Sequence, residues 1–69
     1  MRAREVNRKI EKAGGVHKRT VGSHKRYKVT VKDVTASTSV PQHPGDIPTG
    51  TLFKIQKDLE PALGRKWLL

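Results

Sequence analysis

The chain has 69 residues, so we expect a single domain spanning residues 1–69. It contains no cysteine, which excludes disulfide bridges and thiolate zinc sites and fits a reducing compartment. No apolar run approaches the ~20 residues that cross a membrane, and no signal-peptide core follows Met1. We therefore expect a cytoplasmic protein with no membrane partner.

The positive charge is unevenly distributed along the chain. The formal net charge is +9; residues 1–32 contain 11 Lys/Arg and 2 Asp/Glu, whereas residues 33–69 contain 4 of each. Such an imbalance is typical of proteins that bind nucleic acid, and less often of those that bind an anionic membrane or an acidic protein. A basic surface that serves only solubility is the alternative.

Residues 3–13 are predicted to form an amphipathic helix. Its apolar positions recur at spacings of three and four, and they are Ala3, Val6, Ile10 and Ala13. The pair Gly14-Gly15 ends the helix, because glycine tolerates the left-handed conformation of a helix C-terminus.

Residues 16–21 and 24–32 are predicted to form two strands of a hairpin. Gly22-Ser23 between them suits a two-residue type II′ turn, which has glycine first. A two-residue turn fixes the register, and it predicts the pairs Val21 with His24, Arg19 with Arg26, and His17 with Lys28.

This register predicts one polar and one apolar face for the hairpin. The polar face is expected to carry His17, Arg19, Val21, His24, Arg26 and Lys28. The core face is expected to carry Val16, Lys18, Thr20, Lys25, Tyr27, Val29 and Val31, with Lys18 and Lys25 at its edge. Arg19 opposite Arg26 is destabilising by itself, and a bound phosphate backbone would relieve the repulsion. A merely solvated basic face is the alternative.

The second half of the chain is predicted to complete the sheet and add a second helix. Residues 35–39 form a short third strand ending near Val40-Pro41, after a turn at Asp33, and residues 41–48 form a loop rich in proline and glycine. A helix follows from Thr49 to about Leu59.

The second helix and the tail supply the remaining apolar residues. The buried stripe is predicted to contain Leu52, Ile55 and Leu59 with Phe53 beside it, and Pro61 is expected to stop or kink the helix. The tail, with Leu63, Trp67, Leu68 and Leu69, is expected to fold back on the core or to bind a partner. The fold class is therefore an α+β, two-layer α-β-β-β-α sandwich with a three-stranded antiparallel sheet and both helices on one face.

An ordered set of short motifs resembles the HicA-type mRNA interferase toxins of bacterial and archaeal toxin–antitoxin pairs. In chain order these are Arg4-Glu5-Val6, Gly14-Gly15, Lys18-Arg19, Gly22-Ser23-His24 with Tyr27, Val40-Pro41-Gln42-His43, and Gly50-Thr51-Leu52 with Ile55. The resemblance covers roughly residues 2–59. It implies the fold of a double-stranded-RNA-binding domain, metal-independent cleavage of mRNA, His24 as the catalytic histidine, and neutralisation by a HicB-type antitoxin.

A histidine suits RNA cleavage because RNA supplies its own nucleophile, the 2′-hydroxyl group. His24 would act as the general base that takes the proton of this hydroxyl. The residues predicted to bind RNA are Lys18, Arg19, Gly22, Ser23, Lys25, Arg26 and Lys28. His43 is the candidate for a second role as general acid, unless it is only a turn residue that bonds to the backbone.

Other readings of these residues stay open. His24 could serve only as a phosphate contact, and Tyr27 is more readily a core residue than a platform for stacked bases. The three histidines lack a carboxylate at recognisable ligand spacing, so we expect neither a metal nor a cofactor. The competing functions are a non-catalytic RNA-binding module and a protein whose basic face docks an acidic partner.

Overall fold

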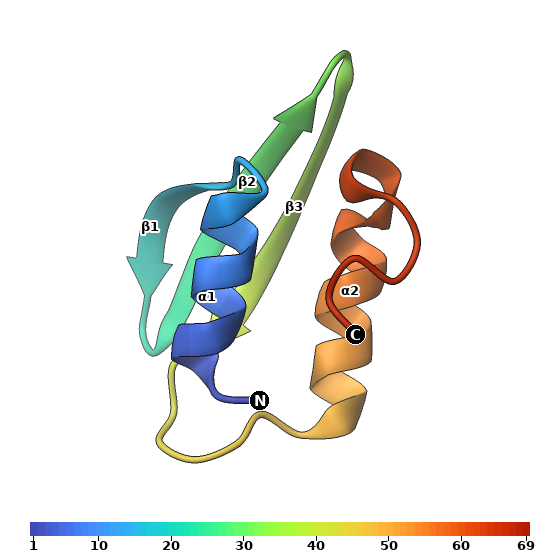
Figure 1. The fold of residues 1–69 in the computed structure, drawn as a ribbon. Coiled ribbons are helices and arrows are strands. Elements are labelled where there is room, and N and C mark those ends of the chain that lie inside the picture. Colours follow the sequence, from blue (N-terminus) through green and yellow to red (C-terminus); the bar gives the residue numbers. More distant parts are fainter.

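The computed structural model describes residues 1–69 and confirms the predicted sandwich. The elements, in chain order, are α1 (Ala3–Lys12), β1 (Val16–Val21), β2 (His24–Val31), β3 (Val34–Pro41) and α2 (Thr49–Leu63). The strands form one antiparallel sheet in the order β1-β2-β3. Figure 1 shows both helices on the same face of this sheet, so its other face, called the open face below, is uncovered.

Helix α1 begins at Ala3, as predicted, and ends at Lys12, one residue before its predicted end. The Glu5 carboxylate accepts a hydrogen bond of 3.0 Å from the Arg2 backbone N–H, a donor that the helix itself leaves free. Val6 and Ile10 are completely buried against the sheet. Gly14, at φ +100°, turns the chain out of the helix and into β1.

The core lies between the helices and the sheet. Twelve apolar side chains form one buried cluster: Ala3, Val6, Ile10, Tyr27, Val29, Ala36, Val40, Ile47, Leu52, Ile55, Leu59 and Leu68. Burial of each large apolar side chain stabilises the fold by about 1.5–3 kcal/mol. None of them comes from β1, whose residues are exposed throughout. The edge strand β1 is therefore held mainly by its hydrogen bonds to β2.

The hairpin register is as predicted near the turn and wrong beyond it. Val21 pairs with His24 and Arg19 with Arg26, but an irregularity at Lys18 then shifts the ladder. His17 consequently pairs with Tyr27 rather than with Lys28, which pairs with Val16. A β-bulge of this kind adds one residue to one strand, and nothing in the local sequence marks its position.

The bulge exchanges the faces of the residues before it, because side chains alternate along a strand. His17, predicted on the polar face, lies on the helix side, with its ring centroid 5.6 Å from that of Tyr27 and its Nε2 3.0 Å from Thr20 Oγ1. Val16 and Lys18, predicted on the core face, lie on the open face instead; Val16 is 56% exposed.

Strand β3 is longer than predicted, because eight residues from Val34 to Pro41 pair with the whole of β2. Val31 and Val34 close a two-residue turn made of Lys32 and Asp33, as the sequence suggested for Asp33. Lys32 adopts φ +55° there, a conformation in which glycine carries no penalty and lysine does.

Helix α2 continues past its predicted end near Leu59 and includes Pro61 in its last turn. Proline removes one backbone hydrogen bond there, but the Gly64 N–H still closes the helix on the Glu60 carbonyl at 2.8 Å. Phe53, predicted beside the buried stripe, is 55% exposed and contributes little to the core.

The C-terminal tail folds back on α2, as expected (Figure 1). The Trp67 Nε1–H donates to the Gln56 carbonyl at 2.8 Å, and the Leu69 N–H donates to the Gln56 side-chain Oε1 at 2.8 Å. Leu68 is buried, whereas Leu69 remains half exposed. Neither helix has the length and the apolar composition needed to cross a membrane.

Candidate active site

The β1–β2 turn places His24 at the start of β2. Gly22 has φ +59° and Ser23 does not have a positive φ, the combination of a type II′ turn. Because side chains alternate along β2, His24 and Arg26 lie on the open face while Tyr27 points into the core. The imidazole is therefore exposed at one end of a basic sheet face.

The loop after β3 brings His43 beside His24. Pro41 ends β3 opposite His24, and the Gln42 N–H donates to the Ser23 carbonyl at 2.6 Å. The two imidazole centroids are 6.1 Å apart with the ring planes at 83°. His43 Nε2 also lies 3.5 Å from the Ser23 hydroxyl oxygen, a long hydrogen bond.

The position of His43 depends on a polar clamp between α1 and this loop. The Gln42 and Asn7 side-chain amides form two hydrogen bonds, of 2.8 and 3.2 Å, and Gln42 Nε2 also donates to the Val40 carbonyl at 2.9 Å. Asn7 is 8% exposed, so the clamp is largely shielded from water. Buried amides that are hydrogen-bonded to each other in this way keep the segments that carry them in one fixed arrangement.

A surface depression of about 390 Å³ surrounds the two imidazoles. It is lined by His24, Ser39, Pro41, His43, Pro48, Thr51 and Lys54. Sequence reasoning did not select Ser39, Thr51 or Lys54. Ser39 could have been found from its pairing with Arg26 in the sheet. Thr51 and Lys54 could not, because they lie on α2, whose position beside His24 depends on the tertiary fold. Lys54 is held by an ion pair of 2.9 Å with Asp58.

The predicted basic residues do not all lie on one face. Arg19 and Arg26 form a directly opposed pair, and Lys28 follows two residues along β2 on the same side of the sheet. Lys18 joins them on the open face because of the bulge. Lys25 pairs with the buried Val40 and therefore lies on the helix side, away from His24.

No carboxylate neutralises the open face. The molecule has two ion pairs, the N-terminal amine with Asp46 and Lys54 with Asp58. Glu11 lies on the other side of the sheet, where it accepts a hydrogen bond of 2.6 Å from the Tyr27 hydroxyl. The Arg and Lys side chains of the open face are thus free to meet an anionic ligand.

Tyr27 is a structural residue and not a surface for stacked bases. Its side chain is 1% exposed. Burial first, and then the hydrogen bond to Glu11 and the charge of that carboxylate, raise the pKa of the Tyr27 phenol well above its ordinary value. No group of three or more His, Cys, Asp or Glu side chains that could hold a metal ion is present.

The chain matches the model of one known protein family. The model of the HicA toxin of bacterial toxin–antitoxin systems matches residues 3–60, which is most of the chain and includes both imidazoles of the depression. The chain belongs to the HicA toxin family. It is therefore a toxin of a toxin–antitoxin system, and it has an antitoxin as its partner. No curated protein and no solved structure matches it.

Proposed function

We propose that the protein is a metal-independent endoribonuclease that cleaves mRNA, with His24 as the general base. The observation that carries this proposal is the exposed His24 imidazole in a depression at the end of an uncompensated basic sheet face. Phosphates of the RNA backbone bind the Arg and Lys side chains of that face, which positions the strand without choosing a sequence.

The reaction requires two proton transfers. His24 takes the proton of a ribose 2′-hydroxyl, whose oxygen attacks the adjacent phosphorus while the bond to the 5′-oxygen breaks. The leaving 5′-oxygen needs a proton in return. The products are a 2′,3′-cyclic phosphate and a 5′-hydroxyl end. Each such transfer contributes roughly 10²–10⁴-fold to the rate.

His43 is the residue that supplies the second proton. Its ring centroid is 6.1 Å from that of His24. The two rings line the same depression, so one phosphodiester group placed there lies next to both imidazoles. His17 has no such access, because it lies on the helix side of β1 against Tyr27.

The three histidines supply a matched test of these roles. We expect His24→Ala to abolish cleavage of a single-stranded RNA and His43→Ala to slow it by roughly 10²–10⁴-fold, with RNA binding retained. His17→Ala is the control and should cut at the wild-type rate. Full cleavage by His24→Ala would refute the assignment, and binding without cleavage by the wild type would favour a non-catalytic RNA-binding module.

The antitoxin is proposed to be of the HicB type and to cover the open face. A surface with several unpaired cations favours a partner whose contact surface is acidic, because complementary charge speeds association and excludes wrong partners. Such a partner would block RNA from His24 and from the basic side chains at the same time.

A further inference from the structure

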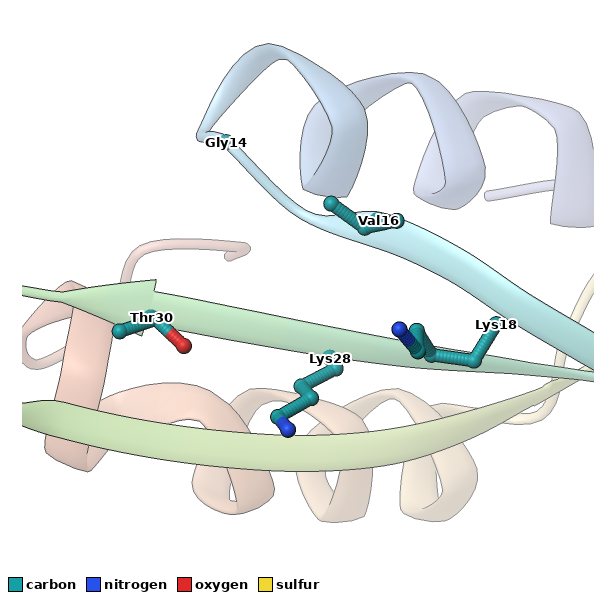
Figure 2. Close-up of a pocket in the computed structure, with 5 residues that line it drawn as sticks. All are labelled: Gly14, Val16, Lys18, Lys28 and Thr30. Atoms are coloured by element: carbon teal, nitrogen blue, oxygen red, sulfur yellow. The ribbon is translucent and has the colours of Figure 1, made fainter.

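A second depression lies on the open face at the far end of the sheet from His24. Figure 2 shows its lining: Gly14, Val16, Lys18, Lys28 and Thr30. It has a volume of about 390 Å³, and a water molecule in the liquid takes about 30 Å³. The depression therefore has room for a hydrated phosphate group.

The bulge in β1 brings Lys18 to this depression. Without it, Lys18 would have pointed to the helix side, as the unshifted register predicted. With it, Lys18 reaches from β1 over β2 on the same side of the sheet as Lys28 and Thr30, while the Lys28 side chain extends toward β3 (Figure 2). Placing two ammonium groups around one hollow is unfavourable in the free protein, since neither has a carboxylate partner.

The chemistry of the lining selects a phosphate and not a base. Two ammonium groups and the Thr30 hydroxyl are hydrogen-bond donors, and Val16 is the only apolar side chain. No aromatic ring is available on which a nucleobase could stack. A phosphate group in the depression would accept hydrogen bonds from these donors through its several oxygens and reduce the repulsion between the lysines.

The distance from His24 limits how far along the strand this phosphate can lie from the cleaved bond. Four residues along β2 separate His24 from Lys28, which corresponds to roughly 13 Å at ~3.3 Å per residue. A nucleotide in a duplex strand advances ~3.4 Å along the axis, so the phosphate at Lys28 lies several nucleotides from the cleaved one at most. An extended single strand covers the distance in fewer nucleotides.

We propose that the Lys18–Lys28 depression is a remote phosphate subsite that holds the RNA backbone a few nucleotides from the cleaved bond. The proposal rests on the proposed function, in that the RNA cut at His24 is the same strand. The subsite supplies binding energy far from the reacting atoms, so it makes the enzyme prefer longer strands without changing the chemical step.

The test compares Lys18→Gln/Lys28→Gln with the control Lys9→Gln/Lys57→Gln, which removes the same charge from exposed positions on the two helices. Affinity for a single-stranded oligoribonucleotide is measured against salt concentration, in a His24→Ala background so that no strand is cut. We expect about tenfold weaker binding at low salt and a loss of about 0.7–1 from the salt slope in the first pair only.

Cleavage then separates this proposal from the proposed function. With His24 intact, the first pair should lower kcat/KM for long strands more than for a dinucleotide, mainly through a higher KM. Equal binding and equal salt slopes in both pairs would overturn the subsite even if cleavage stands. Loss of antitoxin binding with unchanged RNA affinity would also overturn it, because the depression would then be a protein contact. A chain that binds RNA without cutting would refute only the proposed function.

Discussion

The roles of individual residues follow from the side of the sheet on which each side chain lies. His24 and Arg26 are two residues apart on β2 and face the same way, whereas Lys25 between them points to the helices. Tyr27 also points inward, and its hydroxyl group reaches Glu11 on α1. The side chains of His24 and Arg26 are thus exposed on the open face of β2, while Tyr27 packs into the core on the other face.

Tyr27 gives the protein a specific sensitivity to alkaline pH. Its pKa is raised by burial and by Glu11, so above about pH 10 the unfolded chain loses this proton while the folded chain keeps it. The free energy of unfolding should therefore fall with rising pH, by up to about 1.4 kcal/mol per pH unit from this group. Denaturant unfolding at a series of pH values measures the fall.

The comparison for this prediction is Tyr27→Phe, which keeps the ring and removes the hydroxyl. We expect it to be less stable than the wild type at pH 7 by about 1 kcal/mol, because one hydrogen bond is lost. The difference in the free energy of unfolding between wild type and variant should shrink and then change sign above pH 10. Parallel stability curves for the two proteins would show that Tyr27 does not titrate differently in the folded and unfolded states.

Among the elements, the loop between β3 and α2 matters most for the site. It carries His43, and it is fastened to α1 through Gln42 and Asn7 and to the β1–β2 turn through the Ser23 carbonyl. Three segments that are far apart in sequence therefore fix the distance between the two imidazoles. Gln42 is a positioning residue and His43 is the residue that it positions.

Loss of the clamp should impair cleavage more than it impairs folding. Asn7→Ala leaves the Gln42 amide without its partner, so we expect a loss of about 1–3 kcal/mol in the free energy of unfolding. Cleavage by the folded protein should fall toward the rate of His43→Ala, while RNA affinity stays unchanged. Cleavage and RNA affinity are measured below the unfolding transition.

Gln56→Ala is a matched control for this variant. It also removes a buried amide, but that amide holds the C-terminal tail and does not touch the His43 loop. It should therefore lower stability and leave the cleavage rate of the folded protein intact. Equal losses of cleavage in Asn7→Ala and Gln56→Ala would mean that the clamp acts only through stability.

Local patterns in the sequence predicted the helices and strands, but they did not predict the contacts between these elements. Gly22-Ser23 predicted the hairpin and its first pairs, and the apolar spacing predicted both helices, because these signals depend on near neighbours. The bulge at Lys18 has no such signal, and it moved three side chains to the opposite face. The Asn7–Gln42 clamp joins residues 35 positions apart, a pairing that no local pattern shows. His24 lies on the exposed face on which the hairpin register predicted it, but its proximity to His43 depends on the tertiary fold.

At the scale of the whole molecule, the distribution of charge determines what the protein can bind. The chain has 15 Lys/Arg and 6 Asp/Glu, yet only one lysine side chain, Lys54, takes part in an ion pair. The helices and the core lie on one side of the sheet (Figure 1), so the open face carries the unpaired side chains of Lys18, Arg19, Arg26 and Lys28 between the two depressions. A polyanion that spans the two depressions relieves more repulsion than any single contact does.

Cleavage of one defined RNA in the presence of EDTA tests the central claim most directly. The substrate is a single strand offered in two forms, one entirely of ribonucleotides and one with a 2′-deoxyribose at the cleaved position. We predict that the wild-type chain cuts only the first form, leaves a 2′,3′-cyclic phosphate, and loses this activity in His24→Ala. Cleavage of the deoxy form at the same position, or loss of all activity in EDTA, would contradict a mechanism in which His24 activates the 2′-hydroxyl without a metal ion.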